Sequence, residues 1–289
     1  MTTIKADLLM VVKVKVIVFC VVLFVCIPKL EGQSHVGDTL TTWKTLAYDG
    51  ASAFGGSKHA YSRPFHWGKA DFLKAGGIVL GTAALFTFDE ESSNWFQRQE
   101  EDVPGVLKET GYYLGKPLYN YSLNGGVYLI GLLRKNEDWR KTGVLLISSA
   151  TTVGLIQTVS KTLVGRARPI TNVGKASFEP FSNEAAYHSF PSGHTILAFT
   201  TFYAIGKQFE NPWAKGGFYT LGLLSPVSRL WSGAHWLTDV ALSIAVSVVV
   251  VDSIDKYLEK ERYPVEFSKD RISWKLQVGP GTIGLRGTF

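Results

Sequence analysis

Apolar segments separated by short polar breaks dominate the sequence from about residue 71 to residue 260. Apolar positions recur there with helical spacing and predict helices at about 71–88, 105–117, 121–134, 139–165, 194–209, 214–230 and 238–260. Charged or glycine-containing breaks, such as 135–138 and 211–217, separate several of these segments. The pattern predicts an all-α fold, a helical bundle of about six core helices.

Two of these segments, 143–159 and 240–251, are apolar on nearly every side. A helix of this kind lies either in the centre of a core or across a membrane. Because a span needs about 20 apolar residues, only the longer run would cross a bilayer comfortably. The sequence therefore leaves open a soluble or peripherally attached bundle and an integral membrane bundle.

The N-terminus has the layout of a secretory signal. Lysines precede the apolar run 16–27, and a polar stretch follows it. We expect residues 1–32 to be a signal peptide or, failing cleavage, an N-terminal membrane anchor. Residues 33–70 are mixed and polar with frequent aromatics, and they predict an extended or short-helical lead-in. The helical domain is expected to span 71–262.

The C-terminal tail, 263–289, changes character. From Ser273 apolar and polar residues alternate, a GPG turn follows, and the alternation continues to Phe289. This pattern predicts a short C-terminal β-hairpin. The hairpin could cap the bundle, or its alternating apolar residues could contact an outer membrane.

Composition narrows the partners and the chemistry. The chain has 289 residues, of which 46% are hydrophobic, and a net charge of +6 whose basic residues are scattered. Scattered basic residues do not follow a nucleic-acid backbone, so nucleic acid is not an expected partner. Both cysteines, Cys20 and Cys26, lie in the first apolar segment, so the domain that follows cannot contain a disulfide or a thiolate metal site.

Polar residues interrupt the apolar half at three places. In KTLVGRARP, Lys161 and Arg168 are two helical turns apart, which would bring both cations onto one face. In FPSGHT, the free backbone N–H groups of Ser192 and Gly193 at a helix start could point at an anion beside His194. Taken alone, the first segment also fits a solvated helix end, and the second fits an ordinary helix cap.

The third segment, SRLWSGAHWLTD, contains Arg229, His235 and Asp239. At helical spacing, the Asp239 carboxylate could accept a hydrogen bond from one ring nitrogen of His235, which would leave the other nitrogen free to attack. An isolated His and Asp four residues apart also fit an ordinary contact on a helix surface.

Together the segments contain the groups that phosphoryl transfer requires. Lys161, Arg168 and Arg229 could neutralise one phosphoryl group, while His235 acts as nucleophile and His194 as general acid. No cluster of Asp and Glu with metal-ligand spacing accompanies them in the sequence. Lysine and arginine would then do the work of a metal ion, so we expect neither a metal nor another cofactor.

The three segments match, in order, the signature KxxxxxxRP, PSGH and SRxxxxxHxxxD. The chain therefore resembles the type 2 phosphatidic acid phosphatase (PAP2) superfamily, over the signature at 161–239 and over the bundle from about 71 to 260. The resemblance implies a helical, metal-independent phosphatase that forms a phosphohistidine on His235. By motif position, His194 would protonate the leaving group and Asp239 would orient His235. The implied phosphate-binding residues are Lys161, Arg168, Ser192, Gly193 and Arg229.

Several substrates fit this resemblance. The apolar helices and the export signal favour a lipid phosphate or diphosphate, of the isoprenoid, phosphatidic acid or lipid A type, and association with a membrane. A broad-specificity periplasmic acid phosphatase acting on soluble monoesters is the main alternative. Vanadium haloperoxidases, which resemble this family, and a non-catalytic envelope protein are remote ones. We expect an exported protein in the periplasm or an envelope membrane, with its site on the non-cytoplasmic side.

Overall fold

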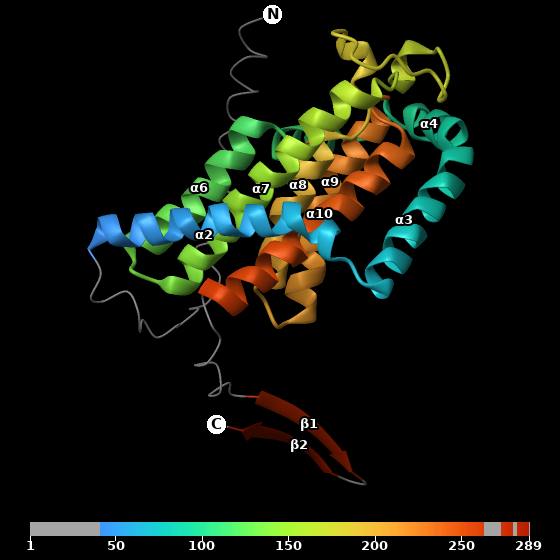
Figure 1. The fold of residues 1–289 in the computed structure, drawn as a ribbon. Helices are drawn as coiled ribbons and strands as arrows, with labels where there is room; N and C mark the ends of the chain where they lie inside the picture. Colours follow the sequence, from blue (N-terminus) through green and yellow to red (C-terminus); the bar gives the residue numbers. More distant parts are fainter. Residues whose placement is uncertain (1–40, 263–272, 280–281, 289) are drawn as a thin grey trace, which may run out of the picture.

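The computed structural model describes residues 41–262, 273–279 and 282–288, and this part of the chain is mainly helical (Figure 1). The predicted signal peptide lies outside the described residues. The helices are α2 (Thr42–Ser62), α3 (Lys69–Thr87), α4 (Asp89–Arg98), α5 (Gly105–Leu114), α6 (Pro117–Leu133), α7 (Glu137–Val164), α8 (Gly193–Lys207), α9 (Pro212–Trp231) and α10 (Leu237–Tyr257). Short 3₁₀ turns occupy Arg63–His66, Pro169–Thr171 and Ala185–Tyr187, and a π-helical turn, Leu258–Arg262, extends α10.

The helix boundaries follow local chemistry. The side chain of Asn136 caps α7 by accepting a hydrogen bond from the Trp139 N–H, and Pro117 starts α6. Helix α7 ends at Gly165, which adopts the left-handed conformation with φ +57°. A Cβ at Gly165 would collide with the Glu179 carbonyl oxygen, so this turn requires glycine.

The core lies where α7, α8 and α10 meet, and α6 and α9 cover it (Figure 1). Leu145, Leu146, Ile196 and Ile254 are completely buried there. The prediction of an all-α bundle is confirmed for the described residues, and all seven predicted helices are present.

Two helices were not predicted. Helix α2 occupies most of the segment expected to be an extended or short-helical lead-in, and it packs across α7 and α10 (Figure 1). Its buried face is small and polar, with Thr45, Asp49, Ser52 and Gly56, so the usual apolar stripe is missing. Helix α4 is short and acidic, and its first residue, Asp89, is completely buried.

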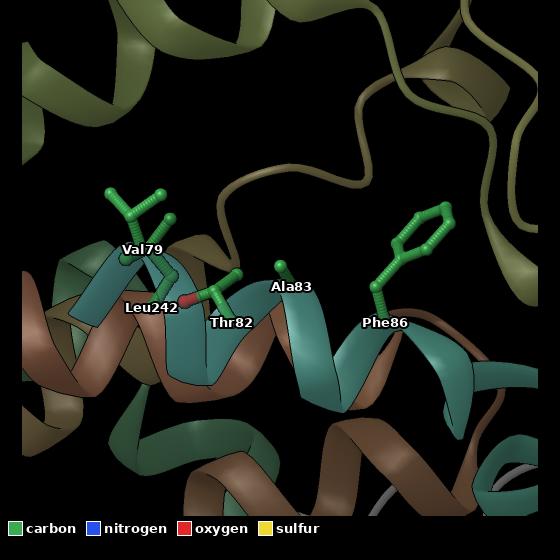
Figure 2. Close-up of a pocket in the computed structure, with 5 residues that line it drawn as sticks. All are labelled: Val79, Thr82, Ala83, Phe86 and Leu242. Carbon is green, nitrogen blue, oxygen red and sulfur yellow. The ribbon is translucent and has the colours of Figure 1, made fainter. Parts of the chain in front are cut away.

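Three helical segments, Lys69–Thr87, Glu137–Val164 and Leu237–Arg262, are long and apolar enough to cross a membrane. No part of the most apolar stretch of α3 is buried, although it is a candidate span. Helices α3 and α10 line an open apolar pocket of about 430 Å³. Figure 2 shows Phe86 and its neighbours on one side of α3, with Leu242 contributed by α10. Such apolar exposure is typical of a membrane protein, which favours the integral bundle over a soluble one.

Strands β1 (Ser273–Gly279) and β2 (Thr282–Thr288) pair antiparallel in the C-terminal tail. Ser273 lies opposite Thr288, and Gly279 lies opposite Thr282. The connecting residues 280–281 and the strand side chains lie outside the described part. A hairpin that caps the bundle or contacts an outer membrane therefore stays a prediction.

Candidate active site

The signature residues gather at one end of the bundle, around a cavity of about 250 Å³. They come from the end of α7, the loop after it, the start of α8, the end of α9, the loop before α10 and the first turn of α10. Six of the eight predicted site residues line this cavity, and Ser192 and Asp239 do not. The lining residues are Gly115, Pro117, Gln157, Lys161, Arg168, Gly193, His194, Leu197, Arg229, Ala234 and His235.

Lys161 and Arg168 face the same cavity, but they do not share a helix. Gly165 ends α7 between them, so Arg168 lies in the loop beyond the helix and the expected two-turn helical spacing is wrong. Both side chains are held by carbonyl groups of another loop. Lys161 donates to the His188 carbonyl at 2.5 Å, and Arg168 Nε donates to the Ala185 carbonyl at 2.9 Å. Burial lowers the pKa of Arg168, with no loss of charge at neutral pH.

At the start of α8, one of the two backbone N–H groups expected to bind an anion is already hydrogen-bonded within the protein. The Ser192 N–H donates to the Ser243 hydroxyl at 3.0 Å, so it is not free for an anion. The Ser192 side chain instead caps the helix by accepting from the Thr195 N–H. The next two N–H groups, those of Gly193 and His194, lie in the first turn of the helix. Neither donates a hydrogen bond to an acceptor among the described residues, so these two groups could bind an anion.

His194 presents its ring to the cavity from the first turn of α8. The ring stacks on Tyr112, with centroids 5.0 Å apart, and its Nε2 atom has no hydrogen-bond partner among the described residues. The Arg229 guanidinium lies over the same tyrosine, 4.8 Å from its centroid. Burial, and then the positive charges of Arg229 and Lys161, lower the pKa of His194 to about 4. His194 is therefore neutral at neutral pH.

His235 is almost completely buried, with 3% of its surface exposed. Its Nδ1 atom lies 2.6 Å from the Ser189 carbonyl oxygen. Because a carbonyl can only accept, Nδ1 must carry the hydrogen and Nε2 keeps its lone pair. Burial, followed by the charges of Lys161 and Arg168, holds the pKa of His235 well below its usual value, so the ring is neutral.

Asp239 does not accept the expected hydrogen bond from His235. The nearest carboxylate oxygen lies 4.0 Å from Nδ1, because His235 precedes α10 and the pair lacks helical geometry. The Asp239 Oδ2 atom instead accepts from the Ser189 hydroxyl at 2.5 Å and from the Trp236 N–H at 3.0 Å. Asp239 thus contacts His235 indirectly, through Ser189.

Sequence reasoning missed Arg166, which lies inside the first motif and is 3% exposed. It also missed Tyr112, Ser189 and Gln157, which surround the cavity or its histidines. Gln157 could have been found, because it precedes Lys161 by one helical turn and shares its face of α7. Among the described residues no group of three His, Cys, Asp or Glu could hold a metal ion.

Comparison with known proteins agrees with this geometry. Residues 142–260 match the family model of the PAP2 superfamily, which confirms the resemblance drawn from the motifs. The matched segment contains all eight predicted site residues. It begins within α7 and ends just after α10.

Three similar proteins are lipid A 1-phosphatases. The chain is 34% identical to the one from Rhizobium etli over 36% of this chain and 44% of the relative. It is 33% identical to the one from Rhizobium johnstonii over 36% of this chain and 42% of the relative. The match to the Porphyromonas gingivalis protein is 33% identical over 28% of this chain and 19% of the relative. The chain thus spans less than half the length of these relatives. No solved structure matches the chain.

Proposed function

We propose that this chain is a PAP2-type phosphatase that removes phosphate from a membrane lipid through a phosphohistidine on His235. One observation carries the proposal. The Ser189 carbonyl fixes the proton of a neutral His235 on Nδ1, which leaves the Nε2 lone pair available on a residue that lines the cation-rich cavity.

In the first step, the Nε2 lone pair of His235 attacks phosphorus and the bond to the lipid oxygen breaks. His194, whose protonated form is favoured by the bound phosphate dianion, gives its proton to that oxygen, so the lipid leaves as an alcohol. In the second step, His194 takes a proton from water, the water oxygen bonds to phosphorus, and the phosphorus–nitrogen bond breaks. Inorganic phosphate leaves, and His235 returns to its starting form.

The cations of the cavity would hold the transferring group through both steps. Lys161, Arg168 and Arg229 all line the cavity, and each can donate to an equatorial phosphoryl oxygen. The free N–H groups of Gly193 and His194 add backbone donors at a helix N-terminus. These donors supply the charge neutralisation that a metal ion supplies in other phosphatases.

A lipid substrate is supported by two facts. The three relatives act on lipid A, as their names state, and three helices of this chain could cross a membrane. We therefore place the substrate among lipid phosphates, and within that class we favour the 1-phosphate of lipid A.

We also propose that the site faces the non-cytoplasmic side, as expected from the export-type N-terminus. Basic residues gather on cytoplasmic flanks of membrane helices. The flanks of the candidate spans away from the site carry Lys69, Lys74, Arg134, Lys135, Arg140, Lys141, Lys256, Lys260 and Arg262.

The test is phosphate release by detergent-solubilised protein from lipid A, phosphatidic acid, an isoprenoid diphosphate and a soluble aryl phosphate. We expect preference for lipid A, loss of the 1-phosphate in the product, and an unchanged rate with EDTA. Equal turnover of the aryl phosphate would instead indicate a broad-specificity phosphatase. A rate that EDTA abolishes would contradict the proposed role of the three cations.

A further inference from the structure

Arg166 is a buried arginine that does not face the cavity. All five N–H groups of its guanidinium have acceptors. Nη1 donates to Asp239 at 2.6 Å and to the Thr238 hydroxyl at 2.7 Å, and Nη2 donates to Asp89 at 2.7 Å. Nε and Nη2 also donate to the Lys175 carbonyl. This arginine therefore joins two carboxylates from different helices and is fixed in one orientation.

The second carboxylate, Asp89, comes from outside the segment that matches the family model. It is completely buried at the start of α4. Its Oδ1 accepts from the Thr238 N–H at 2.9 Å, and its Oδ2 accepts from the Thr238 hydroxyl at 2.5 Å. Asp89 thus locks the first turn of α10, which carries Asp239, against α4 and Arg166.

The network continues to the proposed nucleophile through Ser189. The Arg166 carbonyl accepts from the Ser189 N–H at 2.9 Å, while the guanidinium of Arg166 holds Asp239. Asp239 in turn accepts from the Ser189 hydroxyl, and the Ser189 carbonyl accepts from Nδ1 of His235. Both polar contacts that fix Ser189 beside the histidine thus lead back to Arg166.

We infer that Arg166, locked by Asp89, is a positioning residue that aims His235 at phosphorus by holding Ser189 and Asp239. The inference rests on the proposed phosphohistidine mechanism. Arg166 neither lines the cavity nor contacts the substrate in this arrangement, so its loss should slow the transfer step while phosphate binding stays intact.

The test measures phosphoenzyme formation with a radiolabelled aryl phosphate in detergent-solubilised full-length protein. Lysine has three donors on one nitrogen and cannot reproduce the fork that reaches both carboxylates. We expect Arg166→Lys to lower the rate of labelling by about 10- to 100-fold, as losses of outer hydrogen-bond partners do, with KM unchanged. Asp89→Asn, which keeps the side-chain shape, should lower it in the same direction and carries the test if Arg166→Lys does not fold.

A double-mutant cycle separates positioning from a general loss of structure. If Arg166 acts through Asp239, the variant Arg166→Lys/Asp239→Asn should label no more slowly than Asp239→Asn alone. Arg140→Lys alters a buried ion pair at the other end of α7, and it should label at the wild-type rate per folded molecule. Additive effects in the cycle, or wild-type labelling by Arg166→Lys, would overturn the inference. Wild-type protein with no label on His235 would instead overturn the proposed mechanism.

Discussion

Two buried arginine–aspartate pairs lie near the two ends of α7, and they differ in what they hold. Arg140 and Asp49 join α7 to α2, with Nε of Arg140 2.9 Å from Oδ2 of Asp49. Arg166, just beyond the other end of the helix, contacts two carboxylates, Asp89 and Asp239. Both arginines are almost completely buried, with 5% and 3% of their surfaces exposed. Burial and pairing alone therefore do not distinguish them.

The difference lies in the connections of each pair. The Tyr128 hydroxyl also donates to Asp49, so this pair fastens α2 and α6 to the start of α7. The Arg166 pair connects through Ser189 to a histidine that lines the cavity. Arg140 lies about 36 Å along α7 from the end of the helix at Val164, at a rise of 1.5 Å per residue. A buried ion pair indicates a functional role only when its contacts lead to the reacting groups.

The largest expected effect tests the histidine at the end of the Arg166 network. His235→Gln removes the nucleophile, and turnover should fall by about 10⁴-fold or more, as it does when other covalent nucleophiles are removed. Wild-type protein quenched in an alkaline denaturant should carry an acid-labile, base-stable phosphoryl label on His235, and the variant should carry none. Peptide mapping checks the position. A label on another residue, or turnover that survives the substitution, would refute the assignment.

A second prediction addresses the Arg140 pair. Arg140→Met breaks the buried ion pair with Asp49, so unfolding should become easier by about 3–5 kcal/mol. The measurement is the thermal midpoint in detergent, together with turnover per folded molecule, which should not change. The double variant Asp49→Leu/Arg140→Met removes both charges and should regain most of the lost stability. Lower turnover in folded Arg140→Met would show that the far end of α7 also positions the site.

The residues at the site end of α7 were not equally predictable from the sequence. Lys161 and His235 could be identified because their polar motifs interrupt the apolar half of the chain, and interruptions of this kind are costly unless they serve a site. Ser189 could not be identified, because it acts on His235 through a backbone carbonyl that any residue would supply. Asp89 could not be identified either, because it reaches Arg166 from a distant, short helix.

The helices likewise differ in how well the sequence predicts them. The apolar runs that became α7, α8 and α10 bury large side chains, so periodicity predicted them closely. Helix α2 turns Thr45 and Asp49 inward and exposes Trp43 and Phe54, which reverses the usual pattern. Helices anchored by buried polar contacts are not apparent from apolar periodicity alone.

The smallest expected effect is the uptake of a proton by His194, the second histidine of the cavity, when phosphate binds. The pKa of His194 is about 4, because of burial and the nearby cations Arg229 and Lys161. A bound phosphate dianion favours the charged ring and raises this pKa, so binding at pH 6.5 should add up to about one proton at His194. Calorimetry with inorganic phosphate in buffers of different ionisation enthalpy measures this uptake, and His194→Asn corrects for protonation of phosphate itself. Equal uptake by both proteins would mean that His194 stays neutral in the complex and cannot be the general acid, whereas the arrangement around His235 would be unaffected.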